Sequence, residues 1–82
     1  MYYVYIVKCV DETLYTGIAR ELERRIDEHN GSDKGAKYTR VRRPVTLVYS
    51  EEYPDRSSAS KREYEIKKKM SRTDKLNLIT SY

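Results

Sequence analysis

Five side chains of this sequence could together carry out acid–base and ionic chemistry: Tyr5, Tyr15, Arg25, His29 and Glu63. A phenol or an imidazole can take the proton of an attacking water, and a carboxylate can hold Mg²⁺. An arginine, together with such a metal, can offset the negative charge that develops on a phosphate. These are the groups that hydrolysis of a phosphodiester requires. A phenol acts as a base near neutral pH only where a metal or a nearby cation lowers its pKa.

Arg25 and His29 occupy positions where a simple helical core would have apolar residues. With Leu22 and Ile26 they follow the i, i+3, i+4, i+7 spacing of one helix face. The spacing therefore predicts a helix whose inward face carries a guanidinium and an imidazole.

Glu63 occupies a similar position in a second predicted helix, between Ala59 and Ile66. A partly desolvated carboxylate needs a cation or a metal beside it. In the simpler interpretation, Arg25 and Glu63 form a structural ion pair, and the helix dipole stabilises His29 at a helix C-terminus. Spacing alone favours that interpretation, because structural ion pairs are common. In the alternative, the same side chains line an active site.

Tyr5 and Tyr15 lie on two neighbouring predicted strands, and the loop between the strands decides whether they meet. An odd loop, such as Asp11-Glu12-Thr13, would put both phenols on one face, whereas a two-residue loop would put them on opposite faces. The active-site interpretation requires the odd loop.

The hydrophobic pattern predicts an α+β fold in which helices flank a three-stranded antiparallel sheet, in the order β-β-α-β-α-α. Strands are expected over residues 2–10, 13–18 and 45–53, and helices over about 20–29, after Pro54-Asp55 and from Ser71 onward. Apolar residues on both parities of 2–10 indicate a central strand covered on both faces. Asp55, Ser57 or Ser58 can cap the second helix, and Ser71 with Asp74 resembles a capping box.

Length and composition indicate one small domain spanning residues 1–82, with 38% hydrophobic and 37% charged residues. The single cysteine, Cys9, excludes an internal disulfide and a cysteine-based metal cluster, and is expected in the core. The sequence shows neither a signal peptide nor a stretch of membrane-spanning length. We therefore expect a cytoplasmic protein.

The net charge of +4 arises from an uneven distribution of basic residues. One cluster, with no acidic residue between its first and last members, lies in the polar segment 31–44, and a second follows toward the C-terminus: Lys34, Lys37, Arg40, Arg42 and Arg43, then Lys61, Arg62, Lys67, Lys68, Lys69, Arg72 and Lys75. Basic clusters neutralise phosphates, so nucleic acid is a natural partner, with a merely solvated surface as the alternative. Lys34, Lys37, Arg40 and Lys67 are the predicted nucleic-acid contacts. Tyr38, Tyr49 and Tyr53 are candidates for base stacking, although packing within the protein is favoured for Tyr49.

In this order and spacing, the residues resemble the GIY-YIG endonuclease superfamily. The first motif corresponds to Tyr3-Val4-Tyr5 and the second to Tyr15-Thr16-Gly17. The helical arginine, eight residues beyond the second-motif glycine, falls on Arg25, the histidine one turn later on His29, and the glutamate of the next long helix on Glu63. The stretches DKGAKYTR and AxxxEYEIKK look closest to small, stand-alone bacterial members.

The resemblance implies metal-dependent hydrolysis of nucleic-acid phosphodiesters. It makes Tyr15 the first candidate for general base, with Tyr5 or His29 positioning the water or sharing that role. Arg25 would bind the scissile phosphate, Glu63 would hold one Mg²⁺ or Mn²⁺, and Gly17 would allow close approach. DNA is the expected substrate. Since 82 residues leave no room for a separate recognition domain, sequence specificity is expected to be low, to come from a protein partner, or to be replaced by recognition of substrate shape; a monomer would be enough to cut one strand.

Two departures from the family pattern accompany the resemblance. Tyr3 stands where the first motif has glycine, and Thr16 stands where the second has an aliphatic residue. Two further functions remain open: a nucleic-acid-binding module with weak or no catalysis, and a protein-interaction domain with a relic site.

Overall fold

The computed structural model describes residues 1–31 and 33–81 and has the predicted α+β architecture. Its elements are β1 (Tyr2–Lys8), β2 (Leu14–Ala19), α1 (Leu22–Gly31), α2 (Lys37–Arg40), β3 (Thr46–Tyr53), α3 (Arg56–Lys69) and α4 (Arg72–Thr80). The strands form one antiparallel sheet in the order β2-β1-β3, which confirms the prediction of a central first strand. The short helix α2 was not predicted, because a four-residue turn is too short to show helical periodicity.

The β1–β2 hairpin brings the two candidate tyrosines to one face. The Cys9 N–H donates to the Thr13 carbonyl (2.8 Å) and the Glu12 N–H to the Cys9 carbonyl (2.9 Å), so the loop is residues 10–12. Glu12 completes this turn with a φ of 72°, in the left-handed region. The loop is odd, as the active-site interpretation requires, although it begins one residue earlier than expected. Tyr5 pairs with Gly17, and Tyr15 pairs with Val7, two residues along β1. Tyr5 and Tyr15 therefore share a face of the sheet.

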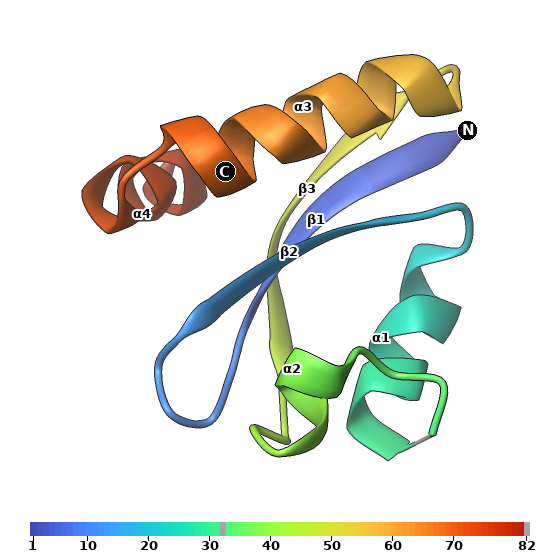
Figure 1. The fold of residues 1–82 in the computed structure, drawn as a ribbon, viewed down its shortest axis with the longest axis vertical. Coiled ribbons are helices and arrows are strands. Elements are labelled where there is room, and N and C mark those ends of the chain that lie inside the picture. Colours follow the sequence, from blue (N-terminus) through green and yellow to red (C-terminus); the bar gives the residue numbers. More distant parts are fainter. Residues whose placement is uncertain (32, 82) are drawn as a thin grey trace.

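Each face of the sheet is covered by different helices, so the molecule has two small cores (Figure 1). On one face, Val4 and Ile6 of β1 pack with Ala59 and Ile66 of α3. On the other face, Tyr5, Val7, Cys9 and Val45 are buried, with Leu22 and Ile26 of α1 packed against them. This double burial explains the apolar residues on both parities of β1.

The helix α3 is tied to β3 by a buried polar cluster around Glu51. The Glu51 carboxylate accepts hydrogen bonds from the hydroxyls of Tyr49 and Tyr53 and from the Arg62 guanidinium. Asp55 caps α3 by accepting from the Ser58 N–H at 2.8 Å. The predicted cap at Asp55 is confirmed, and the cluster fixes the helix that carries Glu63.

The predicted capping box is also present at the start of α4. The Ser71 side chain accepts from the Asp74 N–H, and the Asp74 side chain accepts from the Ser71 N–H. Within the part of the chain that the structure describes, no helix has the length and apolarity needed to cross a membrane.

Candidate active site

The Tyr5 hydroxyl and the His29 imidazole contact each other inside the protein, next to the edge strand β2. The Tyr5 oxygen lies 2.7 Å from His29 Nε2, and both side chains are buried, with exposed fractions of 1% and 0%. Gly17 makes room for this pair, because a Cβ at residue 17 would lie 2.5 Å from the Tyr5 hydroxyl oxygen. The second-motif glycine is therefore a requirement of packing against Tyr5.

His29 is held as a neutral imidazole. Its second ring nitrogen, Nδ1, lies 2.9 Å from Thr39 Oγ1, so both nitrogens have protein partners. Burial, followed by the nearby Arg25 cation, lowers the pKa of His29 to about 4. We expected His29 to position the attacking water or to share the role of general base. The structure instead places the imidazole behind Tyr5, with no exposed surface.

Tyr5 is a neutral phenol at physiological pH. Burial raises its pKa to about 12, and the nearby Arg25 cation offsets only part of that rise. Negative charge on Glu63 also contributes to the raised pKa, so the α3 carboxylate acts electrostatically on this phenol.

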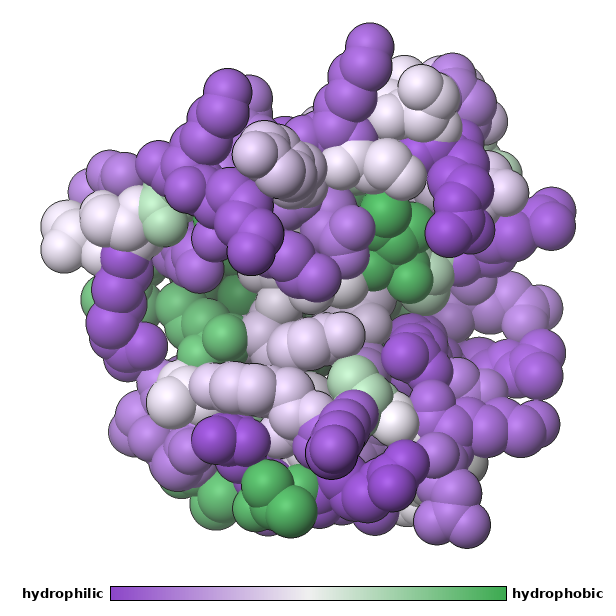
Figure 2. Space-filling view, viewed as in Figure 1, coloured by the Kyte–Doolittle hydropathy of each residue, from purple (hydrophilic) through white to green (hydrophobic). Residues whose placement is uncertain are grey.

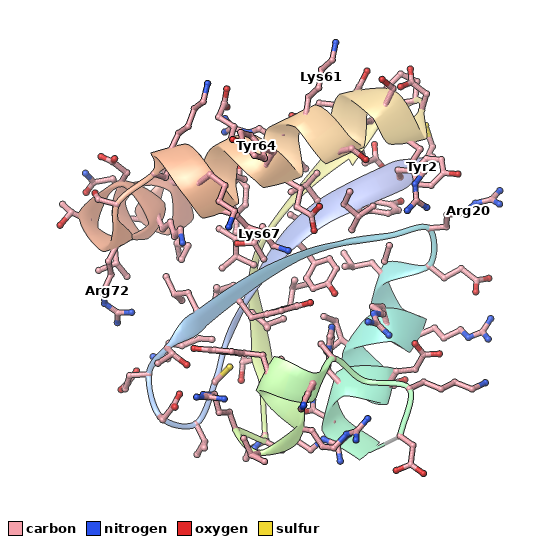
Figure 3. The ribbon with its side chains drawn as sticks, viewed as in Figure 1. Tyr2, Arg20, Lys61, Tyr64, Lys67 and Arg72 are labelled. Atoms are coloured by element: carbon pink, nitrogen blue, oxygen red, sulfur yellow. The ribbon has the colours of Figure 1, made fainter. Side chains whose placement is uncertain are left out.

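Tyr15 is the second phenol of the site and is less buried than Tyr5. Its ring contacts His29 edge-on, with a centroid distance of 5.4 Å, and stacks on Tyr38 at 5.8 Å. The Lys67 ammonium lies 5.6 Å from the Tyr15 ring centroid, although Lys67 belongs to α3. Because β2 is an edge strand, a side chain from α3 can reach past it to Tyr15, and Figure 3 shows Lys67 extending from α3 toward β2.

Arg25 links the site to the basic segment that follows α1. Its guanidinium pairs with Glu28 at 3.0 Å and donates to the Lys34 carbonyl at 2.7 Å. Glu63 pairs instead with Lys67, at 3.2 Å. The simple interpretation of an Arg25–Glu63 ion pair is therefore wrong. Each residue has a partner on or near its own helix, and both charged groups also act electrostatically on Tyr5.

Glu63 is the candidate metal ligand, and its surroundings set what metal it could hold. The described residues contain no group of three or more His, Cys, Asp or Glu side chains suited to a metal. A partly buried single carboxylate does fit Mg²⁺, which commonly keeps several waters and uses one or two carboxylates together with substrate phosphates. It does not fit a closed structural site such as that of zinc.

The segment between α1 and β3 places its basic residues around the site in different ways. Lys37 is exposed on α2, and Arg40 is exposed while donating to the Asp33 carbonyl at 2.7 Å. The Tyr38 ring stacks on Tyr15, and the Arg42 guanidinium carbon lies 3.9 Å from the Tyr38 ring centroid. Tyr38 is also 38% exposed, so stacking of a nucleic-acid base on its ring stays a prediction.

Two features of the site region escaped sequence reasoning. Thr39 contacts His29 from a segment with no periodic pattern, so no spacing rule connects the two residues. Arg20 follows β2, and its guanidinium lies 5.5 Å from the Tyr2 ring centroid. Arg20 also lines the shallow depression that contains Arg25. Figure 2 shows pale and green side chains between the hydrophilic surface of α3 and that of the α1–α2 side.

Comparison with known proteins decides the family to which this arrangement belongs. The GIY-YIG catalytic domain model matches residues 1–77. The chain belongs to the GIY-YIG family. This family is a nuclease superfamily, so membership implies interaction with nucleic acid.

Relatives within the GIY-YIG family are similar in sequence and in fold. A UPF0213 protein of Desulfotalea psychrophila is 62% identical over 78 residues, covering 95% of this chain and 70% of the relative. A UPF0213 protein of Staphylococcus saprophyticus is 57% identical over 79 residues, covering 96% and 94%. The solution NMR structure of a UPF0213 protein from Bacillus halodurans is 44% identical with a TM-score of 0.62, covering 99% of this chain and 85% of that one. These matches confirm the predicted likeness to small bacterial GIY-YIG proteins.

Proposed function

We propose that this GIY-YIG protein is a metal-dependent endonuclease that hydrolyses DNA phosphodiester bonds with low sequence specificity. The observation that carries the proposal is the hairpin register, which puts Tyr5 and Tyr15 on one face beside His29. The Arg25 cation and the Glu63 carboxylate both act electrostatically on Tyr5. A hairpin with only a structural role would not require Tyr5, Tyr15 and His29 to be gathered around Gly17.

Each residue of the site has a distinct role in the proposed reaction. Arg25 binds the scissile phosphate, since its guanidinium is partly exposed and carries a fixed charge. Tyr15 contacts the attacking water and, in its phenolate form, takes the proton of that water, because it is the more accessible of the two phenols. Tyr5 and His29 are buried and hold Arg25 and Tyr15 in orientation. Glu63 would hold Mg²⁺ or Mn²⁺, which when bound supplies Lewis-acid stabilisation of the phosphate and lowers the pKa of bound water.

Cleavage assays with single-residue variants test this proposal. Glu63→Gln and Arg25→Gln should each reduce Mg²⁺-dependent cleavage of duplex, single-stranded and branched DNA by at least about 100-fold. Glu65→Gln is the matched control, because Glu65 lies on the same helix as Glu63 but pairs with Arg62, which is not one of the proposed site residues. Undiminished cleavage in both site variants would refute the proposal.

The alternative of a nucleic-acid-binding module has one specific observation in its favour. Glu63 already has a cationic partner in Lys67, so its charge is balanced by the protein itself. A binding module would show salt-sensitive affinity for DNA that is indifferent to Mg²⁺ and to Glu63→Gln. Binding without cleavage, in either Mg²⁺ or Mn²⁺, would select this alternative.

A further inference from the structure

A chain of buried hydrogen bonds runs from Tyr5, which the Arg25 cation influences, into α2. It comprises Tyr5, His29, Thr39 and the carbonyl group of Ala36. The three side chains have exposed fractions of 1%, 0% and 0%. Water therefore does not compete for these bonds, and each proton position follows from the donors and acceptors present.

Thr39 determines the direction of the chain at its inner end. A threonine hydroxyl has one proton, and the Thr39 hydroxyl donates it to the Ala36 carbonyl at 2.9 Å. Toward His29 Nδ1, also at 2.9 Å, the Thr39 oxygen can then only accept. Nδ1 consequently carries the imidazole proton, and Nε2 carries a lone pair.

Tyr5 requires the same direction from the outer end. Its hydroxyl is protonated and lies 2.7 Å from His29 Nε2, and the Arg25 cation acts on it electrostatically. Nε2 is the acceptor within hydrogen-bond distance and a cation repels the phenolic proton, so that proton goes to Nε2. The Tyr5 oxygen then turns its lone pair to Arg25.

The opposite tautomer has one contact in its favour. The Ala36 N–H is directed at His29 Nδ1 at 3.3 Å, and it forms a hydrogen bond there when that nitrogen is unprotonated. That contact is longer than the 2.7 and 2.9 Å bonds of the chain. The opposite tautomer would also point the Tyr5 proton at the Arg25 cation, which is repulsive.

We infer that Thr39 is a positioning residue that holds His29 as the Nδ1–H tautomer, so that Tyr5 presents a lone pair to Arg25. Through Thr39, α2 contributes to a site whose other residues come from α1, α3 and the β1–β2 hairpin. Gly35 permits this arrangement, since a Cβ there would lie 2.7 Å from the Glu28 carbonyl oxygen. The catalytic consequence rests on the proposed nuclease function, whereas the tautomer does not.

The tautomer can be measured directly because His29 is the only histidine of the chain. In protein labelled with ¹⁵N-histidine, long-range ¹H–¹⁵N spectra at pH 7 should show a protonated Nδ1 and an unprotonated Nε2. Thr39→Val keeps the side-chain shape but removes the acceptor, so it should move the signals toward the Nε2–H tautomer. The same variant should cleave DNA at least tenfold more slowly. Thr39→Ser should restore both the tautomer and the rate.

Each outcome decides the inference. An Nε2–H tautomer in the wild-type protein would overturn it, as would a Thr39→Val variant with the wild-type tautomer. If Thr39→Val does not fold, the wild-type and Thr39→Ser spectra still decide, since both must show Nδ1–H. If the tautomers follow the expectation but no variant and no wild-type protein cleaves DNA, the tautomer assignment stands and the nuclease proposal fails.

Discussion

At the scale of single residues, His29 should make the free energy of unfolding depend on pH. Its folded-state pKa is about 4, below the unfolded value near 6.5, because burial and Arg25 disfavour the imidazolium. The unfolded chain therefore takes up a proton first as pH falls. The stabilisation is complete above pH 6.5 and is lost as pH falls toward 4, by up to roughly 3 kcal/mol. Urea unfolding between pH 8 and 4 measures the effect.

The comparison protein for this measurement is His29→Gln. Aspartate and glutamate side chains titrate in both proteins, so the difference between the two stability curves isolates the imidazole. The wild-type curve should fall more steeply than the variant curve between pH 6.5 and 4. Parallel curves, or an NMR titration of His29 with a midpoint near 6.5, would contradict the burial that the structure shows.

At the scale of elements, the Glu51 cluster should be what holds α3 against β3. The ion pair of Glu51 with Arg62 joins side chains that are only 17% and 23% exposed. Although burial alone would raise the pKa of the Glu51 carboxyl, hydrogen bonds from Arg62, Tyr49 and Tyr53 outweigh it, and the pKa is lowered. Glu51→Gln should therefore reduce the free energy of unfolding by about 1–3 kcal/mol. Chemical denaturation at pH 7 gives this value.

Glu65→Gln provides the control for the same arginine. Glu65 also pairs with Arg62, but its side chain is 51% exposed, so its removal should cost no more than about 0.5 kcal/mol. Hydrogen exchange should additionally speed up in α3 of Glu51→Gln before it does so in α1. Equal stability losses in the two variants would show that the cluster does not anchor the helix.

At the scale of the whole molecule, the basic side chains divide into those facing the site and those facing away. In Figure 3, Lys67 extends from α3 toward β2 and Arg20 lies with Tyr2 at the end of that strand, whereas Lys61 points outward from α3. Arg20 also lines the depression that holds Arg25. A nucleic-acid strand seated on Arg25 would therefore meet Arg20 next. Arg20→Gln should weaken DNA binding several-fold and reduce the slope of log K against log salt concentration by about one.

Lys61→Gln removes the same unit of charge from the outer side of α3 and serves as the control. It should leave the salt slope almost unchanged, because the residue does not face the site. Fluorescence anisotropy with a short labelled DNA over a range of salt concentrations measures both variants. Equal slopes for Arg20→Gln and Lys61→Gln would show that net charge alone governs binding.

The sequence by itself was enough for the fold class and for most of the candidate site. Apolar residues on both parities of β1, the one-sided stripe of α1 and the caps at Asp55 and Ser71 are local patterns, and local patterns follow from backbone geometry. The identities of Tyr5, Tyr15, Arg25, His29 and Glu63 were likewise readable from type and spacing. The family match over residues 1–77 confirms the resemblance on which their alignment depended.

Tertiary structure decided which of those residues touch, because contacts between distant segments depend on loop geometry and packing. The three-residue turn at 10–12 put Tyr5 and Tyr15 on one face, although the sequence allowed either register. Arg25 pairs with Glu28 and not with Glu63, because Glu28 is held close by on the same helix whereas Glu63 belongs to another helix. Thr39 reached His29 through a segment without periodicity, so only the folded chain could place its hydroxyl against the imidazole.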